Sequence, residues 1–202
     1  MADDLVPIQL SLTAGELVTL WAPAWHKDGE SWQAFLGSGD AIFAFPEVVQ
    51  LADFVRTVKV HDLADHPRWP RAASSTLEDL TPRHTHYYNI LGMPRLVNRS
   101  IDSAPIPVLA RIVEMMKSLA DVCELGSIRE ILDTAPGFDL LERGGGAFAG
   151  RSGRRAWIQM GEVVAEEWAG MVATLDGVIE TPPEPEGAPG PASDRGSDSE
   201  PE

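Results

Sequence analysis

The stretch Ile-Gln-Leu-Ser-Leu-Thr-Ala-Gly-Glu-Leu-Val-Thr-Leu-Trp, residues 8–21, decides how this chain begins to fold. Ile8, Leu10 and Leu12 alternate with polar residues, as expected of a strand with one buried face. A turn at residues 14–15 then leads into a second apolar run. The stretch therefore predicts a β-hairpin.

Two further short strands and a helix are predicted after the hairpin. The strands cover residues 32–36 and 41–45, and the loop of residues 37–40 between them contains glycines that suit the positive φ angles of a hairpin turn. Pro46 then occupies a position that a helix tolerates in its first turn, and apolar residues recur at helical spacing to about residue 56. We expect this helix to cover one face of an antiparallel β-meander.

The rest of the chain is predicted to be mainly helical. Prolines interrupt residues 57–104, where we expect irregular connections with short pieces of regular structure, among them an edge strand at residues 87–91. A helix is predicted over residues 105–123, and the capping-box spacing of Ser127 and Glu130 predicts a short helix after it. The last predicted helix, residues 152–179, has the strongest periodicity, with an apolar face of Trp157, Met160, Val164, Trp168, Met171, Leu175 and Val178.

Together these patterns predict an α+β fold: a small antiparallel β-meander packed by helices, a long C-terminal amphipathic helix and a disordered acidic tail. Residues 1–180 are expected to form a single domain, with a sheet-rich part at 1–100 and a helical part at 101–180. From residue 181 to 202 the chain is rich in Pro, Glu, Gly, Ser and Asp and has no apolar residue larger than Ala. Burial in this tail could not offset the entropy lost on ordering.

The chain is strongly acidic. Its 31 Asp and Glu residues against 16 Lys and Arg residues give a formal net charge of −15. A potential of this sign repels nucleic-acid phosphates and anionic lipids. The acidic start at Asp3 and Asp4 is unlike a secretory signal, and no stretch reaches the roughly 18 apolar residues of a membrane span. We therefore expect a soluble cytoplasmic protein that binds proteins, with no nucleic-acid partner and no membrane insertion.

No motif for catalysis or metal binding stands out. Cys123 is the single cysteine, so we expect a small buried hydrophobe rather than a disulfide or a thiolate zinc site. Potential metal ligands gather in two segments beside prolines: His61, Asp62, Asp65 and His66, and then His84 and His86. Exposed loops explain both groups more simply than a site does. Because no nucleophile elbow or phosphate loop is present either, the chain is expected to bind no metal or cofactor and not to be an enzyme.

Basic residues gather near a glycine-rich stretch before the last predicted helix. They are Arg143, Arg151, Arg154 and Arg155, around glycines at 144–146 and 150. A helix N-terminus with flexible glycines can bind an anion, yet arginines oppose the helix dipole there. Two interpretations follow: ion pairs within the chain or across an interface, which we favour, and a small-anion site.

Two tryptophans are candidates for a client- or partner-binding surface. Trp25 follows Pro23 and precedes a polar loop, and Trp69 lies between Arg68 and Pro70. Both are expected to be partly exposed, and exposed tryptophans beside apolar surface are typical of protein-binding sites. A purely structural role, in which the two tryptophans cap the hydrophobic core, explains their positions equally well.

Several short words of the sequence resemble an actinobacterial family. They are residues 1–12, Leu20-Trp21-Ala22-Pro23, Phe54-Val55-Arg56-Thr57 and residues 62–67. Over roughly residues 1–180 the chain is similar to the amino-terminal part of the SatS-like family. This family is named for a mycobacterial cytoplasmic chaperone associated with the accessory SecA export pathway, and its members are often labelled primosomal proteins.

The resemblance implies a non-enzymatic chaperone that binds unfolded or export-destined proteins. It also implies that this chain differs from the longer family protein. That protein continues past a linker into a second domain, where client binding could reside. The primosomal label gains no support, since a net charge of −15 and the lack of a DNA-binding motif argue against contact with DNA. A protein–protein adaptor or scaffold, and a small-anion-binding domain at the arginine-rich start of the last helix, stay open as alternatives.

Overall fold

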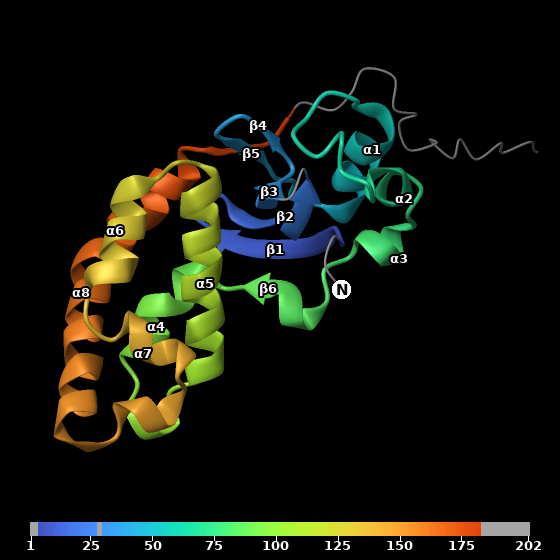
Figure 1. The fold of residues 1–202 in the computed structure, drawn as a ribbon. Helices are drawn as coiled ribbons and strands as arrows, with labels where there is room; N and C mark the ends of the chain where they lie inside the picture. The colour runs from blue at the N-terminus through green and yellow to red at the C-terminus, as the bar shows by residue number, and fades with distance from the viewer. Residues whose placement is uncertain (1–3, 28–29, 183–202) are drawn as a thin grey trace, which may run out of the picture.

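Figure 1 shows the fold in a computed structural model, which describes residues 4–27 and 30–182 and the side chains in these ranges except those of residues 24–31. Strands lie between a longer group of helices on the left and a shorter group on the right. The predicted α+β class is confirmed. Within the described ranges, no helix is both long and apolar enough to cross a membrane.

The central sheet grows from the predicted hairpin. β1 (Val6–Leu12) and β2 (Gly15–Lys27) pair antiparallel, and Gly15 turns the chain with a φ of 120°, which glycine adopts at little cost. β3 (Glu30–Phe35) adds to the other edge of β2. β6 (Tyr87–Tyr88) is shorter than predicted and lies parallel to β1, so the strand order is β3-β2-β1-β6.

A second, three-stranded sheet joins early and late segments of the chain. β4 (Gly37–Ser38) and β5 (Ala41–Phe43) pair antiparallel, and β7 (Ile179–Glu180) runs parallel to β5. The last helix, α8 (Gly150–Asp176), therefore ends before residue 179, where it was predicted to end. The reason is that Ile179 pairs with Ile42 of β5 instead of extending the helix. Thr181 continues the contact by donating its hydroxyl hydrogen to the carbonyl oxygen of Ala44 at 2.9 Å.

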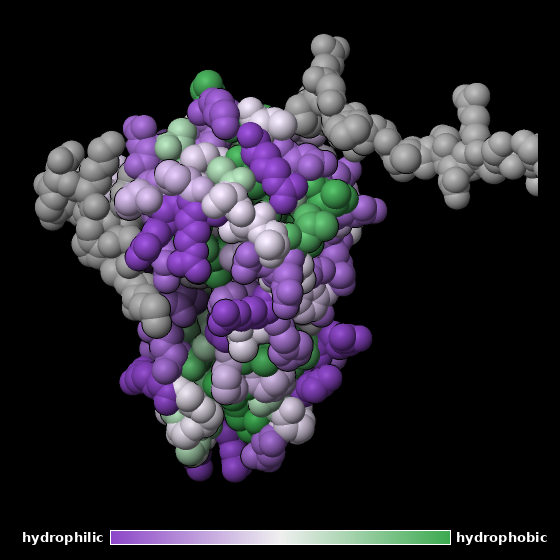
Figure 2. All heavy atoms as spheres, turned by 90° about the vertical axis from the view of Figure 1, so that its right-hand side faces the viewer, coloured by the Kyte–Doolittle hydropathy of each residue, from purple (hydrophilic) through white to green (hydrophobic). Residues whose placement is uncertain are grey.

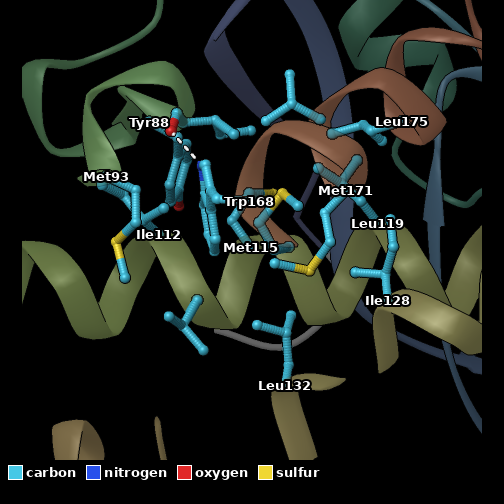
Figure 3. Packing of buried hydrophobic residues seen from close by; sticks show 14 of the residues in the cluster. Tyr88, Met93, Ile112, Met115, Leu119, Ile128, Leu132, Trp168, Met171 and Leu175 are labelled. Carbon is cyan, nitrogen blue, oxygen red and sulfur yellow. Dashed lines mark hydrogen bonds between the residues drawn. The ribbon is translucent and has the colours of Figure 1, made fainter. Parts of the chain in front are cut away.

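The larger hydrophobic core lies between one face of the central sheet and several helices. They include α5 (Ile106–Val122), α6 (Gly126–Thr134), α7 (Phe138–Glu142) and α8. Figure 3 shows Leu119 of α5 close to Met171 of α8 in this core. The predicted apolar face of α8 is buried from Trp157 to Leu175, which confirms the long amphipathic helix. Cys123, just after α5, is buried as expected, and burial raises the pKa of its thiol to about 11.

A smaller core covers the opposite face of β2. Val18 and Leu20 of β2 pack there with α1 (Val48–Thr57), and α2 (Trp69–Ala73) and α3 (Leu77–Leu80) contribute Trp69 and Leu80. These three helices are the group on the right of Figure 1. The helix predicted over residues 46–56 is thus confirmed as α1, and Glu47 caps it together with Gln50.

Two other predictions need correction. α6 begins at Gly126, so Ser127 lies inside the helix and is not its cap. Residues 57–104 contain more regular structure than expected, because short helical turns fit between the prolines. Besides α2 and α3 these include α4 (Met93–Val97) and the 3-10 turns η1 (His84–His86), η2 (Ile90–Gly92) and η3 (Ile101–Ser103); a fourth such turn, η4 (Gly145–Phe148), precedes α8.

Candidate functional site

The structure describes the side chain of one of the two candidate tryptophans, Trp69, and that side chain is buried. Trp69 is only 8% exposed, and its ring centre lies 3.9 Å from that of His61. The expected exposure is therefore wrong for Trp69, because the first turn of α2 places its indole in the smaller core. The side chain of Trp25 lies outside the described residues; its backbone pairs with that of Trp32 on β3, an edge strand. Trp32 itself is 54% exposed.

Two of the histidines predicted to be in exposed loops are buried. His61 contacts the rings of Phe54 and Trp69, and neither of its ring nitrogens has a hydrogen-bond partner among the described residues. Burial lowers the pKa of His61 and outweighs the opposite effect of Asp62. His66 accepts a hydrogen bond at Nδ1. Across the described ranges, no three His, Cys, Asp or Glu residues are placed to hold a metal ion.

The four arginines before and within the last helix do not form one cluster. Arg143 pairs with Asp139 at 2.8 Å on the surface of α7. Arg151, Arg154 and Arg155 lie on the first two turns of α8 around a shallow hollow, and they form no ion pair with another described residue. None of the side chains lining this hollow is buried. An ion pair is therefore present at Arg143, and the role of the other three arginines stays a prediction.

A groove of about 610 Å³ lies between the start of β1 and the segment from α2 to η1. This volume is within the range of sites that bind ligands. Apolar residues from both sides form part of the wall: Leu5, Val6, Pro7, Leu20, Ala72 and Leu80. Figure 2 faces the side of the molecule that carries α2 and α3, and shows its hydrophobic residues in separate patches among hydrophilic ones. The groove is therefore a local apolar site rather than part of a broad apolar surface.

The wall formed by α2 is anchored from inside the protein. The buried indole of Trp69 packs on His61, which fixes the start of the helix against the smaller core. The main-chain N–H of Arg68 donates a hydrogen bond of 3.1 Å to Nδ1 of His66, which shapes the turn before the helix. Arg68 and Arg71 flank Trp69 in sequence and line the groove. Trp69, which was expected to bind a partner, thus instead packs in the smaller core and holds the α2 wall of the groove in place.

The wall formed by α3 is held by a capping box. The N–H of Asp79 donates to Oγ1 of Thr76 at 3.2 Å, and Thr76 donates its own N–H and hydroxyl hydrogen to Oδ2 of Asp79 at 3.1 and 2.8 Å. These bonds hold the pKa of Asp79 below its ordinary value. Arg56 of α1 donates to the carbonyl oxygen of Ser75 at 3.1 Å and ties the connection between α2 and α3 to α1.

The strand edge at the groove has only a short partner. β6 pairs with β1 at Gln9 and Leu10, and the turn η1 replaces any longer strand before it. Residues 6–8 of β1 therefore have no strand partner on that side within the described part of the chain. On that side the outward-facing main chain of this stretch belongs to Pro7, because Leu20 opposite it bonds to Leu36 of the other neighbouring segment. Pro7 has no N–H, so an extended peptide can donate a hydrogen bond to its carbonyl oxygen but cannot form a longer ladder there.

Two interactions hold β6 and η1 in place. Tyr87 donates its hydroxyl hydrogen to Glu16 of β2 at 2.5 Å. Arg111 of α5 donates to the carbonyl oxygens of Thr85 and Tyr87. The boundary of the groove is therefore connected to both the sheet and the larger core.

The rim of the groove is basic, in contrast to the chain as a whole. Arg68, Arg71 and Arg83 line the groove together with two acids, Asp4 and Asp79. Arg68 lies 3.6 Å from Asp4, and Asp79 is engaged in its capping box. Arg71 and Arg83 are exposed and form no ion pair with another described residue. Two arginines are thus left to meet negative charge from a ligand.

His86 also lines the groove, at the end of η1. Burial, followed by the charges of Arg83 and Arg111, lowers its pKa. His86 is therefore mainly neutral at neutral pH, and the positive charge of the rim comes from arginines.

Sequence reasoning missed this groove because its lining is dispersed along the chain. It comes from residues 4–7, residue 20 and several positions between 68 and 86, a stretch that reads as irregular. The one local signal is the Thr-x-x-Asp spacing of Thr76 and Asp79, which predicts a helix start but no groove.

These features define the class of protein: an α+β domain with both faces of its sheet covered, a long C-terminal helix, and a half-open groove with an apolar wall and a basic rim. A family model described as the SatS C-terminal domain matches residues 5–176, and the chain belongs to this family. No curated protein sequence matches it.

Among solved structures, the crystal structure of the SatS C-terminal domain in complex with bromine has a similar fold. The TM-score is 0.67 at 17% sequence identity, and the match covers 88% of this chain and 94% of that chain. The predicted SatS-like family is thus confirmed, but the expected correspondence to the amino-terminal part of SatS is wrong. Short sequence words indicate a family without indicating which of its domains carries them.

Proposed function

We propose that this chain is a non-enzymatic, chaperone-like protein of the cytoplasm that binds unfolded or export-destined proteins in the groove between β1 and α2–α3. The observation that carries the proposal is the combination of an apolar wall with an unpaired strand edge in one groove. Membership of the SatS C-terminal domain family supports a role in protein interactions. The resemblance to an export chaperone supports the choice of clients.

The proposed binding is passive and has little sequence specificity. Apolar side chains of a client enter the groove, while a main-chain N–H of the client donates to the carbonyl oxygen of Pro7 at the edge of β1. Both interactions are available to almost any unfolded segment. The net charge of −15 opposes association between complexes, because each carries the same excess of negative charge. No nucleotide, metal or cofactor takes part in the proposed cycle.

Light scattering of a heat-denatured model protein tests the proposal. Rising amounts of this chain should suppress scattering, with most of the effect reached near an equimolar ratio, because one groove binds one segment. Chelators and ATP should make no difference. An unrelated protein of equal negative charge is the control: equal protection by that protein would mean that charge alone is responsible. No protection at an equimolar ratio would contradict the proposal.

A matched pair of variants locates the activity. Leu5→Ser removes a half-buried apolar side chain from the groove wall, whereas Val60→Ser removes one that is 86% exposed and does not line the groove. Leu5→Ser should weaken suppression several-fold and Val60→Ser should leave it unchanged. Circular dichroism of both variants checks that the fold survives. Equal activity of all three proteins would place client binding elsewhere.

One observation favours a second candidate function, a protein–protein adaptor. Trp32 lies on the edge strand β3 and is 54% exposed, so a folded partner could pair with this edge and cover the indole. Trp32→Ser separates the two functions. An adaptor would lose a single stoichiometric partner in a pull-down, whereas a chaperone that uses the groove would keep its suppression of scattering.

A further inference from the structure

The arginine rim of the groove has a natural counterpart within the same chain. Residues 183–202 contain six acids and Arg195, which gives this segment a net charge of −5. The segment contains five prolines and three glycines, and its apolar residues are no larger than alanine or proline. The segment can therefore satisfy positive charge but cannot fill an apolar wall.

The segment starts close enough to reach the groove. β7 fixes Glu180 beside β5, and Thr181 bonds to Ala44, so the described part of the chain ends close to Phe45 and the start of α1. In Figure 1 β7, in red, runs toward the side of the molecule that carries α1.

A line of ring contacts leads from this exit to the groove. The centres of successive rings are 5.2 Å apart from Phe45 to Phe54, 6.4 Å from Phe54 to His61 and 3.9 Å from His61 to Trp69. Trp69 lies next to Arg68 at the rim. Twenty residues span up to roughly 70 Å when extended, which is several times this path.

We propose that the acidic segment 183–202 binds the exposed Arg71 and Arg83 at the groove and competes with the segments of other proteins that the groove takes up. The competition rests on the proposed function of the groove. The segment contacts the rim alone, while a client also fills the apolar wall and donates a hydrogen bond to the edge of β1. A client with strong apolar segments displaces the acidic segment, and a weakly apolar protein does not.

Tethering makes a weak contact sufficient. A short flexible connection gives the segment a local concentration in the millimolar range. A contact whose dissociation constant is also about millimolar in solution then occupies the groove about half of the time. At this dissociation constant the client affinity falls about twofold, and at a dissociation constant of about 0.1 mM it falls about tenfold. Because the contact is between exposed charges, salt should remove it.

A peptide of residues 183–202 tests the contact directly. It is labelled with a fluorophore and titrated with the full-length chain in which the six acids of this segment are replaced by their amides, so that the internal competitor is neutral. Anisotropy should report binding that weakens at least fivefold between about 50 mM and about 500 mM salt.

A matched pair of charge reversals locates the contact. Arg71→Glu with Arg83→Glu reverses the rim, and Arg154→Glu with Arg155→Glu makes the same change on the exposed face of α8. The first pair should reduce peptide binding at least fivefold and the second should not. Equal loss in both pairs, or the absence of peptide binding, would overturn the proposal.

The affinity for a client tests the competition. The probe is reduced, carboxymethylated lactalbumin, a permanently unfolded protein, bound to the wild-type chain and to the chain with the amidated segment. The amidated chain should bind two- to tenfold more tightly at low salt and equally at high salt. Equal affinity at both salt concentrations would overturn the competition while the proposed function stands. If neither chain binds lactalbumin, the proposed function fails, and the peptide titration still decides whether the segment contacts the rim.

Discussion

The indole Nε1 of Trp168 donates a hydrogen bond of 2.9 Å to the main-chain carbonyl oxygen of Ile90, which lies 78 residues earlier in the chain. The dashed line at Trp168 in Figure 3 marks this bond. It ties α8 to the turn that follows β6, inside the larger core. Trp168 is 2% exposed, so one side chain both fills the core and satisfies a carbonyl group that water cannot reach.

Two substitutions at Trp168 should separate these contributions. Trp168→Ala should lower the free energy of unfolding by about 3–5 kcal/mol through the cavity it leaves. Trp168→Phe keeps most of the volume and should cost about 1–3 kcal/mol, mainly from the unpaired carbonyl of Ile90. Urea denaturation measures both. Ile158→Ala, at a site on α8 that is 61% exposed, is the control and should change stability little; a stable Trp168→Ala variant would contradict the packing.

Two glycines of α8 should respond in opposite directions to alanine. A Cβ atom at Gly153 would lie 2.4 Å from the carbonyl carbon of Phe148, so Gly153→Ala must displace the backbone of η4 and should destabilise the protein. Gly170 has open space at the same position, and Gly170→Ala should stabilise the helix by about 0.5–1 kcal/mol. Thermal unfolding of the two variants compares them directly. Similar melting temperatures would show that α8 does not pack closely on η4.

His61 should make the stability of the protein depend on pH. Its pKa is lowered from the ordinary value of 6.5 because the buried imidazole is favoured in its neutral form. In the unfolded chain this histidine has its ordinary pKa. As the pH falls below that ordinary value, the unfolded chain binds a proton before the folded protein does, so the free energy of unfolding decreases. Stability should therefore be constant above about pH 7 and decrease toward pH 5.

Variants of two histidines provide the check on this prediction. Urea denaturation across the pH range should show a smaller decrease for His61→Leu than for the wild type. The control is His84→Gln at an exposed position, which should keep the full decrease. An unchanged slope in His61→Leu would assign the pH dependence to other groups.

Removal of residues 183–202 should leave the fold unchanged. These residues contain no large apolar side chain, so their burial could contribute little free energy. The cut belongs after Pro182, because Thr181 still bonds to Ala44. Differential scanning calorimetry should find the melting temperature within about 1 °C of the full chain. Thr181→Val tests the last described contact and should cost about 0.5–1.5 kcal/mol; a drop of several degrees on truncation would show that the segment packs on the domain.

Elements with a regular pattern of apolar residues were predictable from the sequence. The first hairpin, α1, α5 and the buried face of α8 follow directly from periods of two and 3.6 residues. The end of α8 was not predictable in this way. Ile179 continues the helical spacing, but pairing with Ile42 releases it from the helix, and no local pattern reports a partner 137 residues away.

The candidate site was much less predictable than the fold. Trp69 was singled out as exposed because its neighbours Arg68 and Pro70 are typical of surface, yet α2 directs its indole inward. His61 looked like a loop residue because its segment, residues 61–66, lies directly before Pro67. Leu5 and Leu80 both line the groove although they lie 75 residues apart, and no local sequence pattern indicates that they share one site.

The parallel pairing of β7 with β5 also determines when this protein can finish folding during its synthesis. β5 leaves the ribosome early, but its partner strand ends at Glu180 and is made at least 130 residues later. At about 5–20 residues per second, the edge of β5 remains without that partner for roughly 7–27 s. During this interval the nascent chain exposes an unpaired strand of its own. Until Glu180 emerges, we expect the nascent chain itself to be a substrate for cellular chaperones.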